Sequence, residues 1–266
     1  MMDHGEAVAH SGVMGSNHTL TRSSKTITMA TRSQPQRSFR NRLLNNLPPA
    51  TQRRLRKHLK EVTLSQRDSL HEPGKPLRYV YFPETAVAAL LTVLKDGTHT
   101  EVASIGCEGM AGLSAFLGAK KSLRRAFCQM PGTAWRLSTA ELLRETRRGG
   151  PLSDILHRYA LALFTLMAQL ATCNRLHTIE QRCCCWLLMT HDRIEGDEFY
   201  VTHEFLSEML GARRSGVTVI AGDLQRAGLI SYTRGRITIL NRRGLEKAAC
   251  ECYAAVRAAF DRLIGT

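Results

Sequence analysis

The chain has no long run of apolar residues, because charges break its longest hydrophobic stretches. No segment is therefore expected to cross a bilayer. Its first residues also lack the charged-then-apolar order of a signal peptide. The eight cysteines have none of the regular spacing of a secreted disulfide framework, and three of them are adjacent, Cys183–Cys185. Together these absences predict a protein of the reducing cytoplasm.

The sequence also lacks the short motifs typical of enzymes: a nucleophile elbow, a phosphate-binding loop, zinc-ligand spacing or paired carboxylates. We therefore expect no enzymatic activity, no metal and no cofactor. Positive charge is in excess, with 37 Lys and Arg against 23 Asp and Glu and a net charge of +14. Such an excess favours a polyanionic partner.

The stretch from Thr202 to Asn241 has the pattern of a helix-turn-helix followed by a hairpin. Thr202 is a good N-cap for the first helix, and Gly211 interrupts that helix as a tight corner requires. The second helix has an apolar stripe at helical spacing, formed by Val217, Ile220, Ala221 and Leu224. Residues 217–220 are also a β-branched run, which on propensity alone favours a strand. The flanking pattern favours the helix.

Side chains opposite that stripe are short or cationic: Arg214, Ser215, Thr218 and Gly222. A helix that bears them can lie deep in a major groove and reach base edges. Two β-prone runs, Leu229–Tyr232 and Ile237–Leu240, then flank Thr233–Arg236 and predict a wing. Seven arginines lie between Arg213 and Arg243, against the single acid Asp223. This basic character favours binding to DNA over packing against protein.

Composition predicts five parts in the chain. Residues 1–38 are rich in Ser, Thr, His and Arg and predict a disordered tail. Residues 39–150 contain short apolar runs cut by turns and predict an antiparallel β-roll, or jelly roll, as a sensor domain. A long helix over 151–176, a winged helix over 177–245 and a C-terminal helix over 246–266 follow. The fold class is thus α+β.

The long helix carries a 4-3 repeat with almost no charge inside it, formed by Leu152, Leu156, Tyr159, Leu163, Leu166, Leu170 and Cys173. An intramolecular core helix would also be apolar. A strict seven-residue period confines the apolar residues to a stripe that is narrower than core packing requires. We therefore favour a helix that pairs with the same helix of a second chain in a homodimer.

This order of parts resembles the Crp/Fnr family of bacterial transcription regulators. The residues that carry the resemblance are Tyr79–Pro83, Asp96–Gly97, Glu101–Val102, Ile105–Gly109, Cys173–Arg175, Glu180–Arg182, Trp186–Leu188 and Thr202–Leu240. The resemblance implies a two-fold dimer, a cyclic-nucleotide-binding-like β-roll, and recognition helices in adjacent major grooves of double-stranded DNA. It also implies RNA polymerase as a partner. Positions that match the family's base-contacting residues are Arg214, Ser215, Thr218 and Val219, and we expect phosphate contacts from Thr202, Arg213, Arg234 and Arg236.

Family members that bind a cyclic nucleotide resemble one another in a Gly-Glu pair for the ribose and an Arg with a small hydroxyl residue for the phosphate. Here Gly112-Leu113 stands at the ribose position, and Arg124-Arg125 stands near the phosphate position. Without the carboxylate we expect an effector other than cyclic AMP, or none.

Iron-sulfur members need clustered thiolates near the N-terminus, and this chain has no cysteine before Cys107. Residues 183–185 lie about 100° apart on a helix and cannot face one metal. Cys250 and Cys252 are expected to point apart on the C-terminal helix, so the thiols are interpreted as structural. The alternative function is a nucleotide-responsive regulatory subunit that acts through protein contacts, which would not need Arg214 or the arginine wing.

Overall fold

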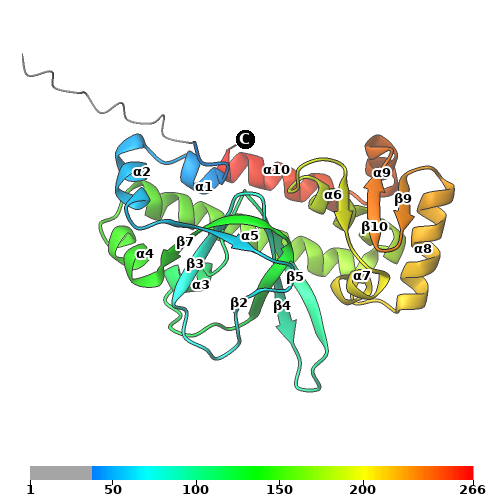
Figure 1. The fold of residues 1–266 in the computed structure, drawn as a ribbon, viewed down its shortest axis with the longest axis horizontal. Helices are drawn as coiled ribbons and strands as arrows, with labels where there is room; N and C mark the ends of the chain where they lie inside the picture. Colours follow the sequence, from blue (N-terminus) through cyan, green and yellow to red (C-terminus); the bar gives the residue numbers. More distant parts are fainter. Residues whose placement is uncertain (1–37, 266) are drawn as a thin grey trace, which may run out of the picture. The chain divides into compact units, whose positions relative to one another are not determined.

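A computed structural model of the protein describes residues 38–265, so the predicted tail lies outside the described residues apart from Ser38. After two short helices, the described part contains two antiparallel sheets (Figure 1). One has the strand order β1-β7-β3, with bounds Lys60–Leu64, Gly132–Ser138 and Tyr79–Pro83. The other has the order β2-β6-β4-β5, with bounds Ser69–His71, Arg125–Met130, Val87–Val93 and His99–Ile105. The predicted β-roll is confirmed.

Large apolar side chains from both sheets are buried in one hydrophobic core, among them Val80, Phe82, Leu91, Phe127 and Leu137. A turn at residues 95–98 joins β4 to β5, and the amide of Leu94 donates to the carbonyl of Thr98 at 2.7 Å. Gly97 has a φ of 86°, which a residue with a side chain rarely adopts. Four short helices surround the sheets: α1 (Arg42–Asn45), α2 (Pro49–Arg56), α3 (Leu113–Phe116) and α4 (Thr139–Thr146).

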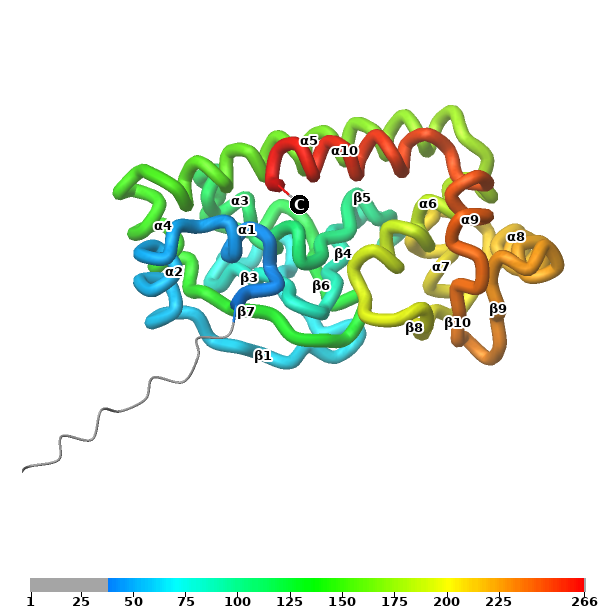
Figure 2. The backbone as a smooth tube through the Cα atoms, turned by 90° about the horizontal axis from the view of Figure 1, so that it is seen from above, coloured from blue at the N-terminus to red at the C-terminus, as the bar shows by residue number. Residues whose placement is uncertain are grey.

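The long helix α5 spans Pro151–Leu176, close to the expected bounds, and lies alongside α10, Cys252–Ile264 (Figure 2). It begins with Pro151 in its first turn, where proline leaves no hydrogen bond unmade. It ends at His177, whose backbone is extended. None of the helices within residues 38–265 is both long and apolar enough to cross a membrane.

The apolar seam that we predicted as a dimer interface has a different role. Six of its residues are at most 8% exposed within the single chain, namely Leu152, Leu156, Tyr159, Leu163, Leu166 and Cys173, and Leu170 is half-buried. The Tyr159 hydroxyl donates to the carbonyl of Met110 at 3.1 Å, and its ring contacts Phe260 of α10. The seven-residue spacing therefore marks the face of α5 that packs on its own chain.

A second face of α5 is exposed. Its residues alternate four and three positions apart: His157, Leu161, Phe164, Ala168, Ala171 and Arg175. Leu161 is 54% exposed and Phe164 is 71% exposed. The helix thus presents apolar side chains to solvent on the side away from the core.

The C-terminal module contains α6 (Ile179–His191), β8 (Glu198–Tyr200), α7 (His203–Leu210), α8 (Arg214–Arg226), β9 (Ile230–Thr233) and β10 (Arg236–Ile239). Its β-branched run lies inside α8, so the helix prediction is confirmed. The hairpin also gains a third strand that we did not predict, because β8 pairs with β10.

The prediction of one C-terminal helix over residues 246–266 is wrong. The structure has α9 (Arg242–Ala248), an extended residue at Ala249, and then α10. Leu245 is fully buried in α9, which packs on α6, whereas Val256 and Phe260 belong to a helix that packs on α5. The chain must change direction to satisfy both packing surfaces.

Candidate nucleic-acid interface

The helix-turn-helix is built from α7, a three-residue corner and α8. The Thr202 hydroxyl caps α7 by accepting a hydrogen bond from the amide of Phe205 at 3.1 Å. Gly211 ends α7 with a φ of 58° and ψ of 41°, the left-handed conformation that glycine adopts without strain. Arg213 is the N-cap of α8, and no side chain caps this helix. The first amides of α8 therefore lack a capping acceptor from the chain, which suits an anion.

Helix α8 has one buried and one exposed face. Val217, Ala221 and Leu224 are buried against the module, as the periodicity predicts. The opposite face is exposed and carries Arg214, Ser215, Thr218 and Val219, together with Arg213 at the N-cap. The side chain of Arg214 is 70% exposed, and its Nε lies 3.5 Å from a carboxylate oxygen of Glu204 on α7. An ion pair this exposed contributes little and can be exchanged for another partner.

A polar contact that the sequence did not reveal fixes the position of Thr218. The Thr218 hydroxyl donates to the carbonyl of Arg214 at 3.0 Å and lies 3.0 Å from Nδ1 of His203. The His203 ring is stacked on Tyr232 with centroids 4.2 Å apart. Burial, and then the nearby Arg214, lower the pKa of His203, so its ring is neutral at neutral pH. Since the hydroxyl proton goes to the carbonyl, this arrangement assigns the imidazole proton to Nδ1.

The wing is the hairpin of β9 and β10. Its two turn residues, Arg234 and Gly235, have φ values of 49° and 82°, as in the two-residue turns that match strand twist. Arg234 makes no ion pair within residues 38–265. Arg236, by contrast, lies 2.6 Å from a carboxylate oxygen of Glu198 on β8. The two wing arginines therefore differ in how much free charge they present.

Our count of seven arginines against one acid overstated the free charge of the module. Acidic residues outside residues 213–243 neutralise part of this charge. Some of them are distant in the sequence and approach the arginines only in the folded chain. Arg242 is the clearest case, since it bonds to Asp192, Glu246, His191 and Tyr253. Arg226 pairs with Asp223. Within residues 213–243, the exposed arginines without an ion pair to the described residues are Arg213, Arg234 and Arg243.

Two buried polar contacts connect the β-roll to α6, the first helix of the module. The indole Nε1 of Trp186 donates to Glu101 of β5 at 2.8 Å, and the Ser104 hydroxyl donates to the same carboxylate. Burial raises the pKa of Glu101, while these two donors oppose the shift. Glu101 and Trp186 are among the residues that carry the family resemblance, but no pattern in the sequence predicts that they meet.

The second contact is an ion pair between Glu108, in the loop after β5, and Arg193, in the turn after α6. Both side chains are under 10% exposed, and the guanidinium approaches Oε1 at 2.9 Å from Nη2 and 3.0 Å from Nε. The amide of Gly106 donates to the same oxygen at 3.0 Å. A Cβ on Gly106 would lie 2.5 Å from Cγ of Arg193, so only glycine fits there. The pair is thus almost completely buried.

The four residues predicted to line an effector pocket have contacts of their own. Gly112 has a φ of 97°, and a Cβ there would lie 2.9 Å from Val80, so the backbone itself requires glycine. Leu113 is 6% exposed and belongs to the hydrophobic core. Arg124 is half-buried, and Arg125 lies 3.5 Å from Glu72. Leu113 thus packs in the core at the position where the sequence resemblance would place a ribose-binding carboxylate.

One group of side chains could hold a metal. The expectation that Cys250 and Cys252 point apart is wrong, because they lie at the break between α9 and α10 rather than on one helix. Their ligand atoms and those of Cys173 and His177 all lie within 4.8 Å of one another. Sequence spacing could not reveal this group, since its two halves are separated by more than seventy residues.

Comparison with known proteins identifies the module and the fold. Residues 181–248 match the family model of the Crp-like helix-turn-helix domain. No curated protein sequence matches the chain. A putative transcriptional regulator of the Crp/Fnr family from Eubacterium rectale is 18% identical, over 77% of this chain and 96% of its own, with a TM-score of 0.61. FixK2 from Bradyrhizobium japonicum is 15% identical, over 72% of this chain and 98% of its own, with a TM-score of 0.62.

A third similar structure is the c-di-GMP responsive global regulator CLP of Xanthomonas campestris. It is 14% identical, over 72% of this chain and 99% of its own, with a TM-score of 0.56. These structural similarities show that the chain shares its fold with the three proteins. Residues 181–248 therefore match a Crp-like helix-turn-helix domain, within a chain that has the fold of Crp/Fnr transcriptional regulators.

Proposed function

We propose that the protein is a homodimer that binds an inverted-repeat operator with two copies of α8. The observation that carries this proposal is the division of α8 into two faces. One face is buried in the module, and the other exposes Arg214, Ser215, Thr218 and Val219 to solvent. Arg214 can reach a guanine as a bidentate donor, and Val219, which is 61% exposed, can contact a thymine methyl group. The hydroxyl groups of Ser215 and Thr218 suit either kind of base edge.

Phosphate contacts are proposed around this helix. Arg213 lies at its uncapped N-terminus, and Thr202 lies at the start of α7. Arg234 at the wing tip is free for a phosphate on the flanking DNA. Arg236 must first exchange its bond with Glu198, so its contribution to binding is smaller than that of Arg234.

The dimer is proposed to form through the exposed face of α5. Leu161, Phe164 and Ala168 lie on a stripe with heptad spacing, and apolar stripes of this kind pair in two-stranded coiled coils. Two-fold symmetry then presents the α8 helices to successive major grooves, with half-site centres about 10 bp apart. The alternative of a regulatory subunit that acts only through protein contacts gives no role to the exposed basic face of α8.

The effector of this regulator is proposed to be a molecule other than cyclic AMP, or none, because Leu113 fills the ribose-carboxylate position with an apolar side chain. Calorimetry should detect no cyclic AMP binding in the micromolar range. Binding in that range, with a gain in operator affinity, would overturn this part of the proposal. RNA polymerase is the proposed protein partner, and the cytoplasm is the proposed location.

Selection of binding sites from random duplex DNA tests the proposal. We expect an enriched inverted repeat whose half-sites are centred about 10 bp apart. Sedimentation analysis should find two protein chains bound to each duplex that carries the enriched site. Enrichment of a single half-site bound by one chain, or of no motif, would contradict the proposed mode of binding.

A further inference from the structure

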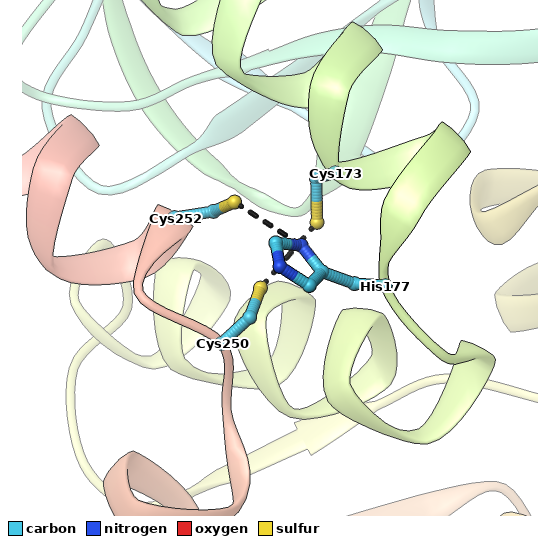
Figure 3. A group of neighbouring side chains, drawn as sticks. All are labelled: Cys173, His177, Cys250 and Cys252. Atoms are coloured by element: carbon cyan, nitrogen blue, oxygen red, sulfur yellow. Dashed lines mark hydrogen bonds between the residues drawn. The ribbon is translucent and has the colours of Figure 1, made fainter.

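Four side chains that the sequence keeps apart come together where α5 ends. Figure 3 shows the sulfurs of three cysteines around the ring of His177. Cys173 lies in the last turn of α5, and His177 is the residue that ends this helix. Cys250 lies in the link between α9 and α10, and Cys252 begins α10. Two segments of the chain thus contribute two ligand atoms each.

The distances match a tetrahedral metal site. Zinc bonds of about 2.3 Å to sulfur and about 2.0 Å to nitrogen place two sulfurs about 3.8 Å apart, and a sulfur and a nitrogen about 3.5 Å apart. The Cys173 and Cys250 sulfurs are 3.5 Å apart. The Cys252 sulfur is 3.4 Å from Nδ1 of His177. All four ligand atoms lie within 4.8 Å of one another, so shifts of up to about 1 Å would centre an ion among them.

The surroundings of these four residues also suit a metal. The imidazole Nε2 of His177 lies 3.4 Å from the carboxylate of Glu251, so a proton on Nε2 leaves Nδ1 free to bind a cation. The side-chain amide of Gln169 donates to the Cys252 sulfur at 3.1 Å, which would stabilise a thiolate. The three cysteines are at most 6% exposed.

We propose that Cys173, His177, Cys250 and Cys252 form a structural Zn²⁺ site. Three thiolates and one imidazole select a borderline-soft ion with tetrahedral geometry over magnesium or calcium, which prefer oxygen. Zinc binds thiolates, so binding of the cation displaces the protons of the three cysteines. Four protein ligands leave no open position for catalysis.

A competing use of the same thiols is a disulfide. Cys250 has two sulfur neighbours, Cys173 at 3.5 Å and Cys185 of α6 at 3.3 Å. A disulfide bond of about 2.05 Å would draw either pair together and would require an oxidant to accept two electrons. It would leave Cys252 and His177 facing each other without a role. Convergence of all four ligand atoms favours the metal.

The site would tie the end of α5, where the chain turns into α6, to the link between α9 and α10. Zinc would thereby fix the junction between the long helix and the DNA-binding module. This consequence, though not the site itself, rests on the proposed function. Removal of zinc should weaken operator binding because the two modules of a dimer would no longer be held at one spacing.

The metal content of the full-length, untagged protein tests the proposal. After growth with zinc and dialysis under reducing conditions, we expect about one zinc per chain. The matched control Cys107→Ser, which alters a thiol outside the group, should keep the metal. Cys250→Ser and Cys252→Ser should lose it. A wild-type protein without zinc, or a Cys252→Ser protein with as much as the wild type, would overturn the site.

Two further measurements guard against loss of metal through misfolding. His177→Cys preserves four ligands and should retain zinc, and its cobalt-substituted form should show stronger thiolate charge-transfer absorption than cobalt-substituted wild type. The disulfide would be favoured over the metal site by two results together. The reduced wild type would give no tetrahedral cobalt spectrum, and peptide mapping of the native protein would find Cys250 in a disulfide bond. Full zinc content without DNA binding would count against the proposed function and not against the site.

Discussion

Replacement of Arg193 by methionine should strongly destabilise the protein. The substitution keeps an unbranched apolar stem but leaves the Glu108 carboxylate buried without its guanidinium partner, beside the Gly106 amide. Breaking a buried pair in this way costs about 3–5 kcal/mol. For a domain of this size, each kcal/mol lowers the melting temperature by about 2–4 °C, so the expected fall is about 6–20 °C.

Thermal and urea unfolding of four variants would measure this effect. Arg226→Met removes an arginine from an exposed pair, with 75% of the Arg226 side chain exposed, and should cost less than about 1 kcal/mol. The double variant Glu108→Gln/Arg193→Met removes both charges and should recover most of the stability, whereas Glu108→Gln alone leaves the arginine unpaired. An Arg193→Met protein as stable as Arg226→Met, or a double variant destabilised by the sum of the two single effects, would refute the reasoning.

Two other predictions concern the helix face and the buried carboxylate. Leu161→Glu/Phe164→Glu should be monomeric in sedimentation because it places charges on the proposed dimer stripe. The control Leu123→Glu, at a β-roll position that is 72% exposed, should stay dimeric. A dimeric double variant would show that this face of α5 is not the interface. Since burial raises the pKa of Glu101, the stability that this group contributes is present below its ordinary pKa of 4.5 and is lost as the pH rises through the folded value. Glu101→Gln should therefore gain stability relative to wild type as the pH rises above 4.5, and a difference that is constant from about pH 4 to pH 8 would show that the carboxyl does not titrate as inferred.

The elements with a clear period could be predicted from the sequence alone. Helix α8 forms despite its β-branched residues because Val217, Ala221 and Leu224 bury one helical face. The hairpin β9–β10 follows from two β-prone runs around Arg234-Gly235. Such elements can be predicted from local patterns because the same residues determine both the secondary-structure propensity and the face that is buried.

Features that depend on contacts between distant segments could not be predicted. A seven-residue period identifies an apolar seam, but it does not say whether the seam meets a second chain or, as here, α10 and the β-roll. No glycine or proline marks the break at Ala249, which arises because α9 and α10 pack on different helices. The error about Cys250 and Cys252 follows from that missed break. Likewise, Glu198 and Asp192 lie outside the arginine-rich window and meet it only in the folded chain.

DNA binding by Arg214→Ala and Arg234→Ala across a salt series tests the central claim most directly. On a selected site and on scrambled DNA, Arg214→Ala should cost about 1–3 kcal/mol per half-site on the selected DNA alone. Arg234→Ala should weaken both DNAs alike and reduce the salt slope by about one unit for each phosphate that an arginine no longer neutralises. Equal weakening of both DNAs by Arg214→Ala, together with altered sequence preference in Arg234→Ala, would reverse the roles of helix and wing. Unchanged binding in both variants would contradict the account.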